Sequence, residues 1–401
     1  MALSVLPMSS VLPMISTKLL KLPPSPLSLN SNHASCSISF GGVVASETRC
    51  KAIAVDSPRE VEDLPDIDWD NLSYAITPTD YIYLTKCARG ENFSGGLRCY
   101  GNGTIDMSVS SGILNNGQGL LEGLKAYRKQ DGGILLFRPE ENALRMKMGA
   151  ARLLMECPSV EQFVNAVKEV VLANQRWVPP FKKGALYIRP LLFGSGSILP
   201  PAPSPECTFL IFVSPVGNYF KGNLSPIHLV VSTEYHRATR GGAGGVKTIG
   251  NYSAVFMAQA NAISSGFNEV LYLDSVHKKY LEEVSACNIF VVKGKSISTP
   301  PIDGTILPGI TRKSVIDIAR NEGYQVVERR IGVEELSDAD EVFGTGCGIV
   351  IAPIGSITYL GKRMVYGDGG VGKVSQQMYS ILTGIQYGLM ADKMGWTVKV
   401  K

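Results

Sequence analysis

Hydrophobic and polar positions along the chain follow the two periods that mark strands and helices. Alternating patterns, or short apolar runs rich in aromatic and β-branched residues, predict strands. Such segments cover residues 106–113, 133–139, 184–194, 207–217, 227–235, 268–274, 288–294 and 349–355. A 3.6-residue period predicts helices over residues 140–155, 159–177, 253–266, 311–323 and 374–390. Strands and helices that follow one another in this way predict an α/β fold.

The length of the chain allows two domains. It has 401 residues, of which 45% are hydrophobic, enough for two substantial cores. We expect a smaller α/β domain over 71–217, an interdomain loop over 218–222, and a larger, cofactor-binding α/β domain over 223–401. The run PVGNYFKGN at this join has the glycines and polar residues of a hinge. Ligand sites are frequent at such domain interfaces.

The first 51 residues are predicted to be a disordered transit peptide, followed by a linker over 52–70. Up to position 40 the segment has no acidic residue and is rich in serine and proline. Arginine first occurs at position 49, which favours a plastid over a mitochondrion as the destination. No later run is long and apolar enough to span a membrane, so no membrane partner is expected.

Charge and metal-ligand residues exclude two further classes of function. The net charge is +4, but the first 51 residues hold four cations and one acid, so the rest is close to neutral. No basic face for nucleic acid is therefore expected. The four histidines are scattered and no C-x-x-C pair occurs among the eight cysteines, so no metal site is predicted.

One lysine stands in a run with few other side chains: GGAGGVKTIGNYSA, residues 241–254, contains Lys247. Such a loop can cradle phosphate, leave room for a flat ligand bonded to the lysine, or lie on the surface. A nucleotide-type phosphate loop needs a glycine before the lysine, and Val246 occupies that position. GDGGVGKV, residues 367–374, is nearer to that motif, but Val374 replaces the magnesium-binding hydroxyl. It predicts a turn before the last helix.

A lysine bonded to pyridoxal 5'-phosphate needs a carboxylate at the ring nitrogen, a donor at the ring oxygen and a phosphate cup. Motifs that meet these needs occur in order along the chain: EGLKAYR, LLFRPEENALRM, LYIRPLLFGSG, SPVGNYF, KTIGNY, YLEEVSACNIF and ILPGITRKSV. Together, over about residues 70 to 400, they resemble the branched-chain amino acid aminotransferases, most of all the plant plastid members.

The resemblance implies a two-domain fold of pyridoxal phosphate fold type IV, like that of D-amino acid aminotransferases, with the cofactor between the domains. It also implies a homodimer in which a loop of the neighbouring subunit completes the pocket. The reaction implied is L-leucine, L-isoleucine or L-valine plus 2-oxoglutarate giving the branched 2-oxo acid and L-glutamate, and its reverse. The partners are therefore small amino acids and 2-oxo acids.

For the cofactor ring, the resemblance assigns three residues. Lys247 carries the cofactor as a Schiff base and moves the substrate proton, which requires its neutral amine. Glu283 is expected to face the ring nitrogen and Tyr252 to bond the ring oxygen. Glu282 is the solvent-facing alternative, because neighbours along a strand point in opposite directions.

The phosphate cup has support from local physics as well. Residues 308–311 end a loop and begin a helix, and a helix N-terminus offers free amides and a positive dipole. The resemblance assigns the amides of Ile310 and Thr311 and the side chain of Arg145 to this group. The last family contact is a threonine where this chain has Cys347, and a thiol donates weakly.

The substrate pocket is implied by the resemblance alone. Its residues are Tyr187, Arg189, Tyr219, Cys347, Gly348, Asn116 and Leu121. Arg189 could instead have a purely structural role. Asn116 and Leu121 stand where relatives have a tyrosine and a phenylalanine, which predicts a slower or substrate-shifted enzyme.

Two groups of alternatives remain open at this point. A D-amino acid aminotransferase or an aminodeoxychorismate lyase would share the fold and keep Lys247 and Glu283. A non-catalytic or substrate-shifted paralogue would keep the fold while the pocket positions change.

Overall fold

The computed structural model describes residues 65–218 and 224–400. The expected transit peptide, most of the linker over 52–70 and most of the loop over 218–222 lie outside these residues. Within the described ranges, no helix combines the length and the apolar character needed to cross a membrane.

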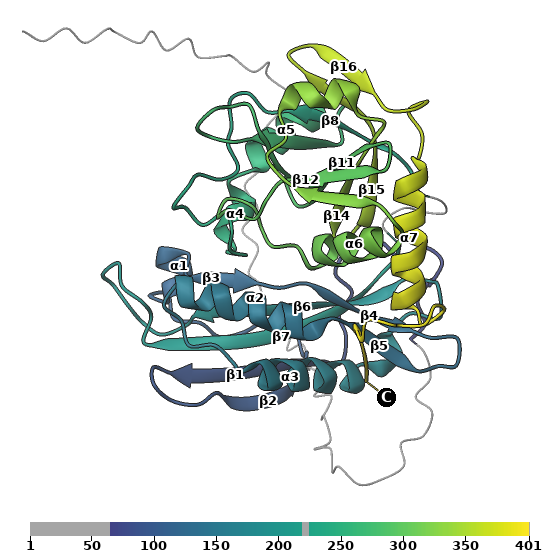
Figure 1. Cartoon of the computed structure of the whole chain (residues 1–401). Helices are drawn as coiled ribbons and strands as arrows, with labels where there is room; N and C mark the ends of the chain where they lie inside the picture. Colours follow the sequence, from purple (N-terminus) through teal and green to yellow (C-terminus); the bar gives the residue numbers. More distant parts are fainter. Residues whose placement is uncertain (1–64, 219–223, 401) are drawn as a thin grey trace, which may run out of the picture. The chain divides into compact units, whose positions relative to one another are not determined.

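The first half of the described chain is built on an antiparallel sheet (Figure 1). Its strand order is β17-β5-β4-β6-β7-β1-β2, and β3 pairs with β6. The strands are β1 Tyr81–Ala88, β2 Ser94–Cys99, β3 Gly119–Leu121, β4 Leu124–Arg128, β5 Ile134–Phe137, β6 Ala185–Gly194, β7 Glu206–Val216 and β17 Thr397–Lys399. The C-terminal strand β17 therefore joins the first sheet, although we expected residues 223–401 to form the second domain.

Two helices cover this sheet and form its core with it. They are α2 Pro139–Arg152 and α3 Val160–Ala173, which follow the predicted 3.6-residue patterns. Helix α3 begins at a capping box, in which Ser159 and Gln162 satisfy each other's backbone amides. Its buried side chains, among them Phe163 and Val167, pack on Phe209 of β7.

The second half is built on a larger sheet that closes on itself. Its strand order is β10-β9-β8-β15-β14-β11-β12-β13, with β16 paired to β15, and β10 also pairs with β11. A closed barrel is thus formed by β8, β9, β10, β11, β14 and β15, and these strands have no free edge. The strands are β8 Ile227–Val231, β9 Glu269–Leu273, β10 Leu281–Val284, β11 Asn288–Lys293, β12 Ser296–Thr299, β13 Gln325–Glu328, β14 Glu341–Gly346, β15 Val350–Tyr359 and β16 Lys362–Val365.

Helices α4 Gly250–Ser253, α5 Phe256–Ser264, α6 Ile310–Asn321 and α7 Lys373–Gln386 complete this half. Helix α7 packs on β15 and also reaches β5, so it contacts both sheets (Figure 1). As expected, the glycine-rich run before α7 is a turn. The carboxylate of Glu341 accepts the amides of Val374 and Ser375, so a side chain of the protein occupies this helix N-terminus.

The strand predicted over 106–113 is wrong. The segment is irregular and enters the short helix α1 Gly112–Asn116. Apart from an isolated bridge between Ser111 and Ser197, no strand among the described residues pairs with it, and Val109 is 88% exposed. The hydroxyl of Ser108 accepts the amide of Ser110 and also bonds its hydroxyl, and such local bonds compete with a strand ladder.

Candidate active site

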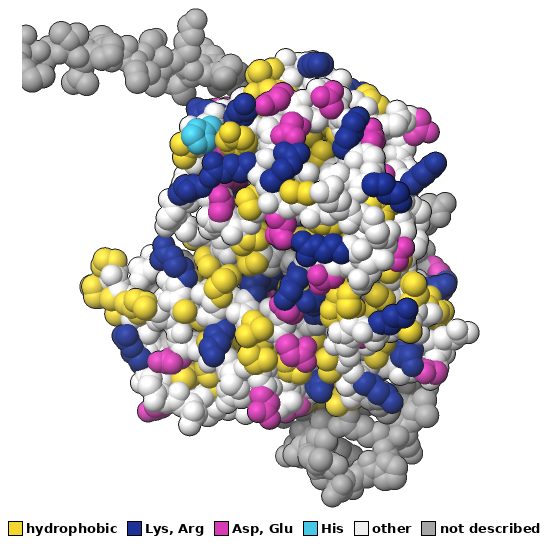
Figure 2. Space-filling view, in the orientation of Figure 1, with side chains coloured by type: hydrophobic (Ala, Val, Ile, Leu, Met, Phe, Trp, Pro, Cys, Tyr) yellow, Lys and Arg dark blue, Asp and Glu magenta, His cyan; other side chains and the backbone are white. Residues whose placement is uncertain are grey.

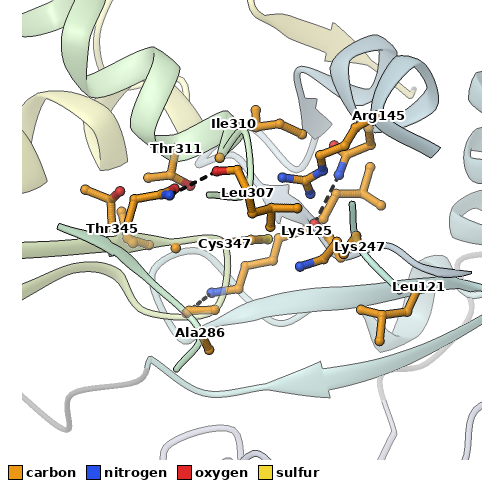
Figure 3. A pocket seen from close by; sticks show the side chains of 18 of the residues that line it. Leu121, Lys125, Arg145, Lys247, Ala286, Leu307, Ile310, Thr311, Thr345 and Cys347 are labelled. Atoms are coloured by element: carbon orange, nitrogen blue, oxygen red, sulfur yellow. Dashed lines mark hydrogen bonds between the residues drawn. The ribbon is translucent and has the colours of Figure 1, made fainter. Parts of the chain in front are cut away.

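A cavity of about 550 Å³ lies between β3 and β4 of the first sheet and the loops of the second half. It contains most of the residues predicted from the sequence. These are Leu121, Arg145, Arg189, Lys247, Tyr252, Glu283, Ile310, Thr311, Cys347 and Gly348. Figure 3 shows Arg145, Lys247 and Leu121 on one side of the cavity and Thr311 and Thr345 on the other.

The segment that carries Lys247 is anchored to the first sheet. The amide of Leu121 donates to the carbonyl of Lys247 (3.1 Å), and the amide of Ile249 donates to the carbonyl of Gly119 (3.1 Å). Two residues of one short strand thus fix the backbone at Lys247 and at Ile249. The Lys247 amine then donates to the hydroxyl of Tyr252 at 2.7 Å. Amine and phenol are therefore presented to the cavity as a pair.

The glycines before Lys247 are required by close packing. A side chain at Gly244 would meet the backbone of Thr305, and one at Gly245 would meet the carbonyl of Gly304. The amide of Gly245 donates to that carbonyl at 3.0 Å. The loop therefore packs against residues 304–305, and the reading as an unpacked surface loop is wrong.

Glu283 reaches the cavity from β10 as one partner of a buried ion pair. Its Oε1 accepts from Arg237 Nη1 at 3.0 Å and from the amide of Leu307 at 2.5 Å. Burial raises the pKa of Glu283 to about 7, and Arg237 and the Leu307 amide act in the opposite direction. Arg237 was not predicted as a site residue, and proximity to the glycine-rich loop would not have found it, because Arg240 lies nearer to that loop.

Glu282 points away from this cavity, as strand alternation predicts. It is not solvent-facing, however, because it is only 6% exposed. It lines a second cavity on the other side of β10. Burial raises the pKa of its carboxyl. The expectation failed because a second layer of loops covers that face of the strand.

An anion site lies at the start of α6. Gly309 caps the helix without a side-chain hydrogen bond, and any side chain there would clash with Asn288. The amides of the first turn, Ile310 and Thr311, therefore have no side-chain cap competing for them. The hydroxyl of Thr345, which lines the same cavity, is buried without a hydrogen-bond partner. A phosphate would satisfy both kinds of donor.

Arg145 lies beside this helix start and is held in place by Glu122. Its Nε and Nη2 donate to the two oxygens of Glu122 at 2.8 and 2.7 Å, and Nη1 donates to the carbonyl of Pro308 at 3.2 Å. Glu122 is buried and belongs to the motif EGLKAYR, which the sequence singled out without a role for its acid. A guanidinium has five N–H groups, so Arg145 keeps donors for an anion.

Cys347 and Gly348 line the cavity near a lysine that the sequence analysis missed. Lys125 donates to the carbonyl of Gly348 at 2.6 Å and is 6% exposed. Burial lowers the pKa of Lys125 and raises that of the Cys347 thiol. The missed signal was a lysine inside the apolar strand pattern of EGLKAYR. Figure 3 shows Lys125 and Cys347 close to the middle of the cavity.

Two predicted substrate residues, Tyr187 and Asn116, do not line this cavity. Tyr187 lies behind it and accepts a hydrogen bond from Arg189 Nη2 at 3.0 Å, and burial raises its pKa to about 12. Asn116 is exposed on α1, where its amide donates to the carbonyl of Ala202 at 3.5 Å. Tyr219 lies outside the described residues.

Comparison with known proteins places the chain in a family. Residues 119–357 match the family model described as Amino-transferase class IV. The chain is 62% identical over 375 residues to branched-chain amino acid aminotransferase 2, chloroplastic, of Humulus lupulus, covering 93% of this chain and 89% of that protein. It is 58% identical over 381 residues to branched-chain-amino-acid aminotransferase 3, chloroplastic, of Arabidopsis thaliana, covering 94% and 92%.

Solved structures show the same similarity in three dimensions. A branched-chain amino acid aminotransferase from Escherichia coli superposes with a TM-score of 0.67 at 26% identity, covering 80% of this chain and 99% of that one. A branched-chain aminotransferase from the thermophilic archaeon Thermoproteus uzoniensis, solved with norvaline, has a TM-score of 0.66 at 26% identity, covering 80% and 100%.

Proposed function

The chain belongs to the plant branched-chain amino acid aminotransferases, within the class IV aminotransferases, and from this we propose the reaction and the role of each residue. It exchanges the amino group of L-leucine, L-isoleucine or L-valine with 2-oxoglutarate, in both directions. Its location is the plastid, as in the chloroplastic relatives.

The cavity fits pyridoxal 5'-phosphate as the cofactor. The free helix start of α6 and the unpartnered hydroxyl of Thr345 offer donors for the phosphate. Both hydrogen bonds to Glu283 end on Oε1, which leaves Oε2 for a protonated ring nitrogen. Another solved branched-chain amino acid aminotransferase, 28% identical to this chain, contains pyridoxamine 5'-phosphate. When bound, this cofactor takes up the electron pair released as the Cα–H bond of the amino acid breaks.

Lys247 is the proposed proton carrier at the substrate Cα. Its amine is the cavity's proposed attachment point for the cofactor, and Tyr252 orients it at 2.7 Å. A neutral amine accepts the Cα proton and returns it to the neighbouring carbon, so one group serves both transfers. Arg237 favours the charged form of Glu283 against the effect of burial, and a charged Glu283 would keep the facing nitrogen protonated.

At the substrate end we assign Arg189, Cys347 and Gly348 to the carboxylate and Leu121 to the aliphatic side chain. All four line the cavity with Lys247. Leu121 is smaller than an aromatic residue and the Cys347 thiol is a weak donor. The branched-chain relatives nevertheless support the branched-chain reaction, and not the substrate-shifted or non-catalytic paralogue or the other two activities of this fold.

A homodimer is proposed as the working form. Exposed apolar side chains lie on α1 and just before it, on the loop between β6 and β7, and on α5; they include Val109, Leu114, Leu199, Phe256 and Met257. Figure 2 shows hydrophobic side chains gathered at the edge of the first half near α1. Phe256 is 62% exposed and also lines the cavity, so a second copy that covers it would help to close the site. Sedimentation equilibrium of the purified protein tests this assembly.

The observation that carries the proposed function is the meeting of Lys247, Glu283 and the start of α6 in one cavity. The test measures oxo-acid formation from L-leucine, D-alanine and aminodeoxychorismate, with 2-oxoglutarate as acceptor where one is needed. We expect turnover of L-leucine to exceed the other two. Preferred turnover of D-alanine or aminodeoxychorismate would assign the chain to another activity of this fold, and no turnover would indicate a non-catalytic paralogue.

A further inference from the structure

A second cavity, of about 320 Å³, lies on the side of β10 that faces away from the active site. It is bounded by the turn between β9 and β10, the loop 300–306 and the side chains of Arg240 and Arg330. Part of its wall is apolar, from Val276, Leu281, Pro300 and Ile306. The volume is at the small end of the range for ligand sites, which suits a compact molecule.

One carboxylate oxygen in this cavity, that of Glu282, has no hydrogen-bond partner. Glu282 is 6% exposed, and its Oε2 is buried without a hydrogen bond. Asp274, by contrast, is satisfied by the amides of His277, Lys279 and Tyr280. The carboxyl group is hydrogen-bonded to Thr305, but a buried oxygen without a hydrogen bond is costly, and a cationic donor would satisfy it.

The rim of the cavity carries two arginines that lie near one aspartate. Arg240 Nη2 lies 3.1 Å and Arg330 Nη2 lies 3.8 Å from the same oxygen of Asp303. Two guanidinium groups thus share one carboxylate, which leaves most of their N–H groups available at the rim. The Arg330 guanidinium also lies 5.6 Å from the ring centre of Tyr280, which holds it over the cavity wall.

From this charge arrangement we propose that the second cavity binds a small aliphatic α-amino acid as its zwitterion. The ammonium group bonds Glu282, the carboxylate bonds Arg240 and Arg330, and the aliphatic side chain packs on Val276 and Ile306. The ammonium and the carboxylate of an α-amino acid are bonded to the same carbon, so one molecule can bond the buried oxygen of Glu282 and the guanidinium groups at the rim.

The bound amino acid would act on the active site through one short loop. Asp303, Thr305 and Ile306 line the second cavity, and the next residue, Leu307, donates its amide to Glu283. The same loop accepts the amide of Gly245 through Gly304, two residues before Lys247. The second cavity therefore shares a wall with the supports of both proposed cofactor residues.

To measure binding at the second cavity alone, the active cavity must first be blocked. This blocking step rests on the proposed function. Borohydride treatment of the enzyme with pyridoxal phosphate leaves the cofactor attached there, and mass spectrometry records this first. A missing attachment would contradict the proposed function and not the second site. Equilibrium dialysis of the blocked protein against labelled L-leucine then measures the second cavity. We expect saturable binding of about one molecule per chain.

Variants and analogues decide the assignment. Glu282→Gln and Arg330→Gln should each weaken L-leucine binding by about tenfold or more, the loss of one charge-assisted hydrogen bond. Lys279→Gln is the matched control, because Lys279 lies on the same turn, pairs with Glu334 and does not line the cavity. 3-Methylbutylamine, which lacks the carboxylate, and 4-methylvalerate, which lacks the amine, should both bind more weakly. Absence of saturable binding, unchanged affinity in both variants, or equal affinity for the amine alone would overturn the proposal.

Discussion

Glu283 and Arg237 form an ion pair in which Oε1 and Nη1 are 3.0 Å apart and both side chains are 3% exposed. The pair connects β10 to the segment before the glycine-rich loop. Charges this deeply buried depend on each other, because neither has water to replace its partner. Arg237 is therefore a positioning residue for the proposed cofactor contact.

Replacing Arg237 should destabilise the protein strongly. Arg237→Met leaves an uncompensated carboxylate in the core, at a cost of about 3–5 kcal/mol. Chemical unfolding of the cofactor-free protein measures it. Arg320→Gln is the control, since Arg320 is 51% exposed and 3.7 Å from Glu328, and exposed pairs contribute about 1 kcal/mol or less. Equal losses in the two variants would contradict this account.

The two adjacent glutamates should differ in their effect on transamination. Glu283→Gln removes the negative charge proposed to face the cofactor nitrogen, and we expect turnover to fall by about a hundredfold or more. Glu282→Gln acts on the other side of the strand, and its turnover should stay within about threefold of wild type. Steady-state kinetics with L-leucine and 2-oxoglutarate measures both. Equal losses would place both acids at the active cavity.

The cofactor-free protein should lose stability as the pH rises toward neutrality, through Glu283. Its folded pKa, raised to about 7, lies above the value of an unfolded glutamate. The folded state then binds the proton more tightly, so this contribution is complete below the unfolded pKa and is lost as the pH rises through about 7. Thermal unfolding from about pH 5 to about pH 8 should show wild type losing Tm relative to Glu283→Gln. Parallel curves would refute the shift.

Lys247 should be indispensable for transamination and dispensable for folding. Its side chain is partly buried and its bond in the cavity goes to Tyr252, so Lys247→Ala leaves the core intact. We expect a loss of several orders of magnitude in kcat with a Tm close to wild type. Peptide mapping after borohydride treatment should find the cofactor on the peptide that contains Lys247. A label on Lys125, which also lines this cavity, would reassign the attachment.

Leu121 and Asn116 should not contribute equally to substrate preference. Leu121 lines the cavity, so Leu121→Phe adds apolar contact worth up to about 1–2 kcal/mol, or about tenfold in kcat/KM for L-leucine. Asn116 lies on exposed α1, so Asn116→Tyr changes kcat/KM only if a second copy brings α1 to a cavity. Kinetics of the single variants separate these effects. No gain from Leu121→Phe would show that other residues already fill that wall.

Local sequence determined the helices, the long central strands and the residues with distinctive local chemistry. The capping box at Ser159, the helix start at Ile310 and the lone Lys247 all depend on neighbours within a few positions. Such short-range signals survive in the folded molecule because no distant contact overrides them.

Only the tertiary structure decided which distant residues meet. Arg237 and Lys125 enter the cavity because strands far apart in the chain become neighbours. Thr397–Lys399 joins the first sheet because β5 offers it a free edge. Alternation along β10 determined that Glu282 and Glu283 face opposite ways, but not that a loop covers Glu282. Periodicity describes one element, whereas burial depends on what packs against each of its faces.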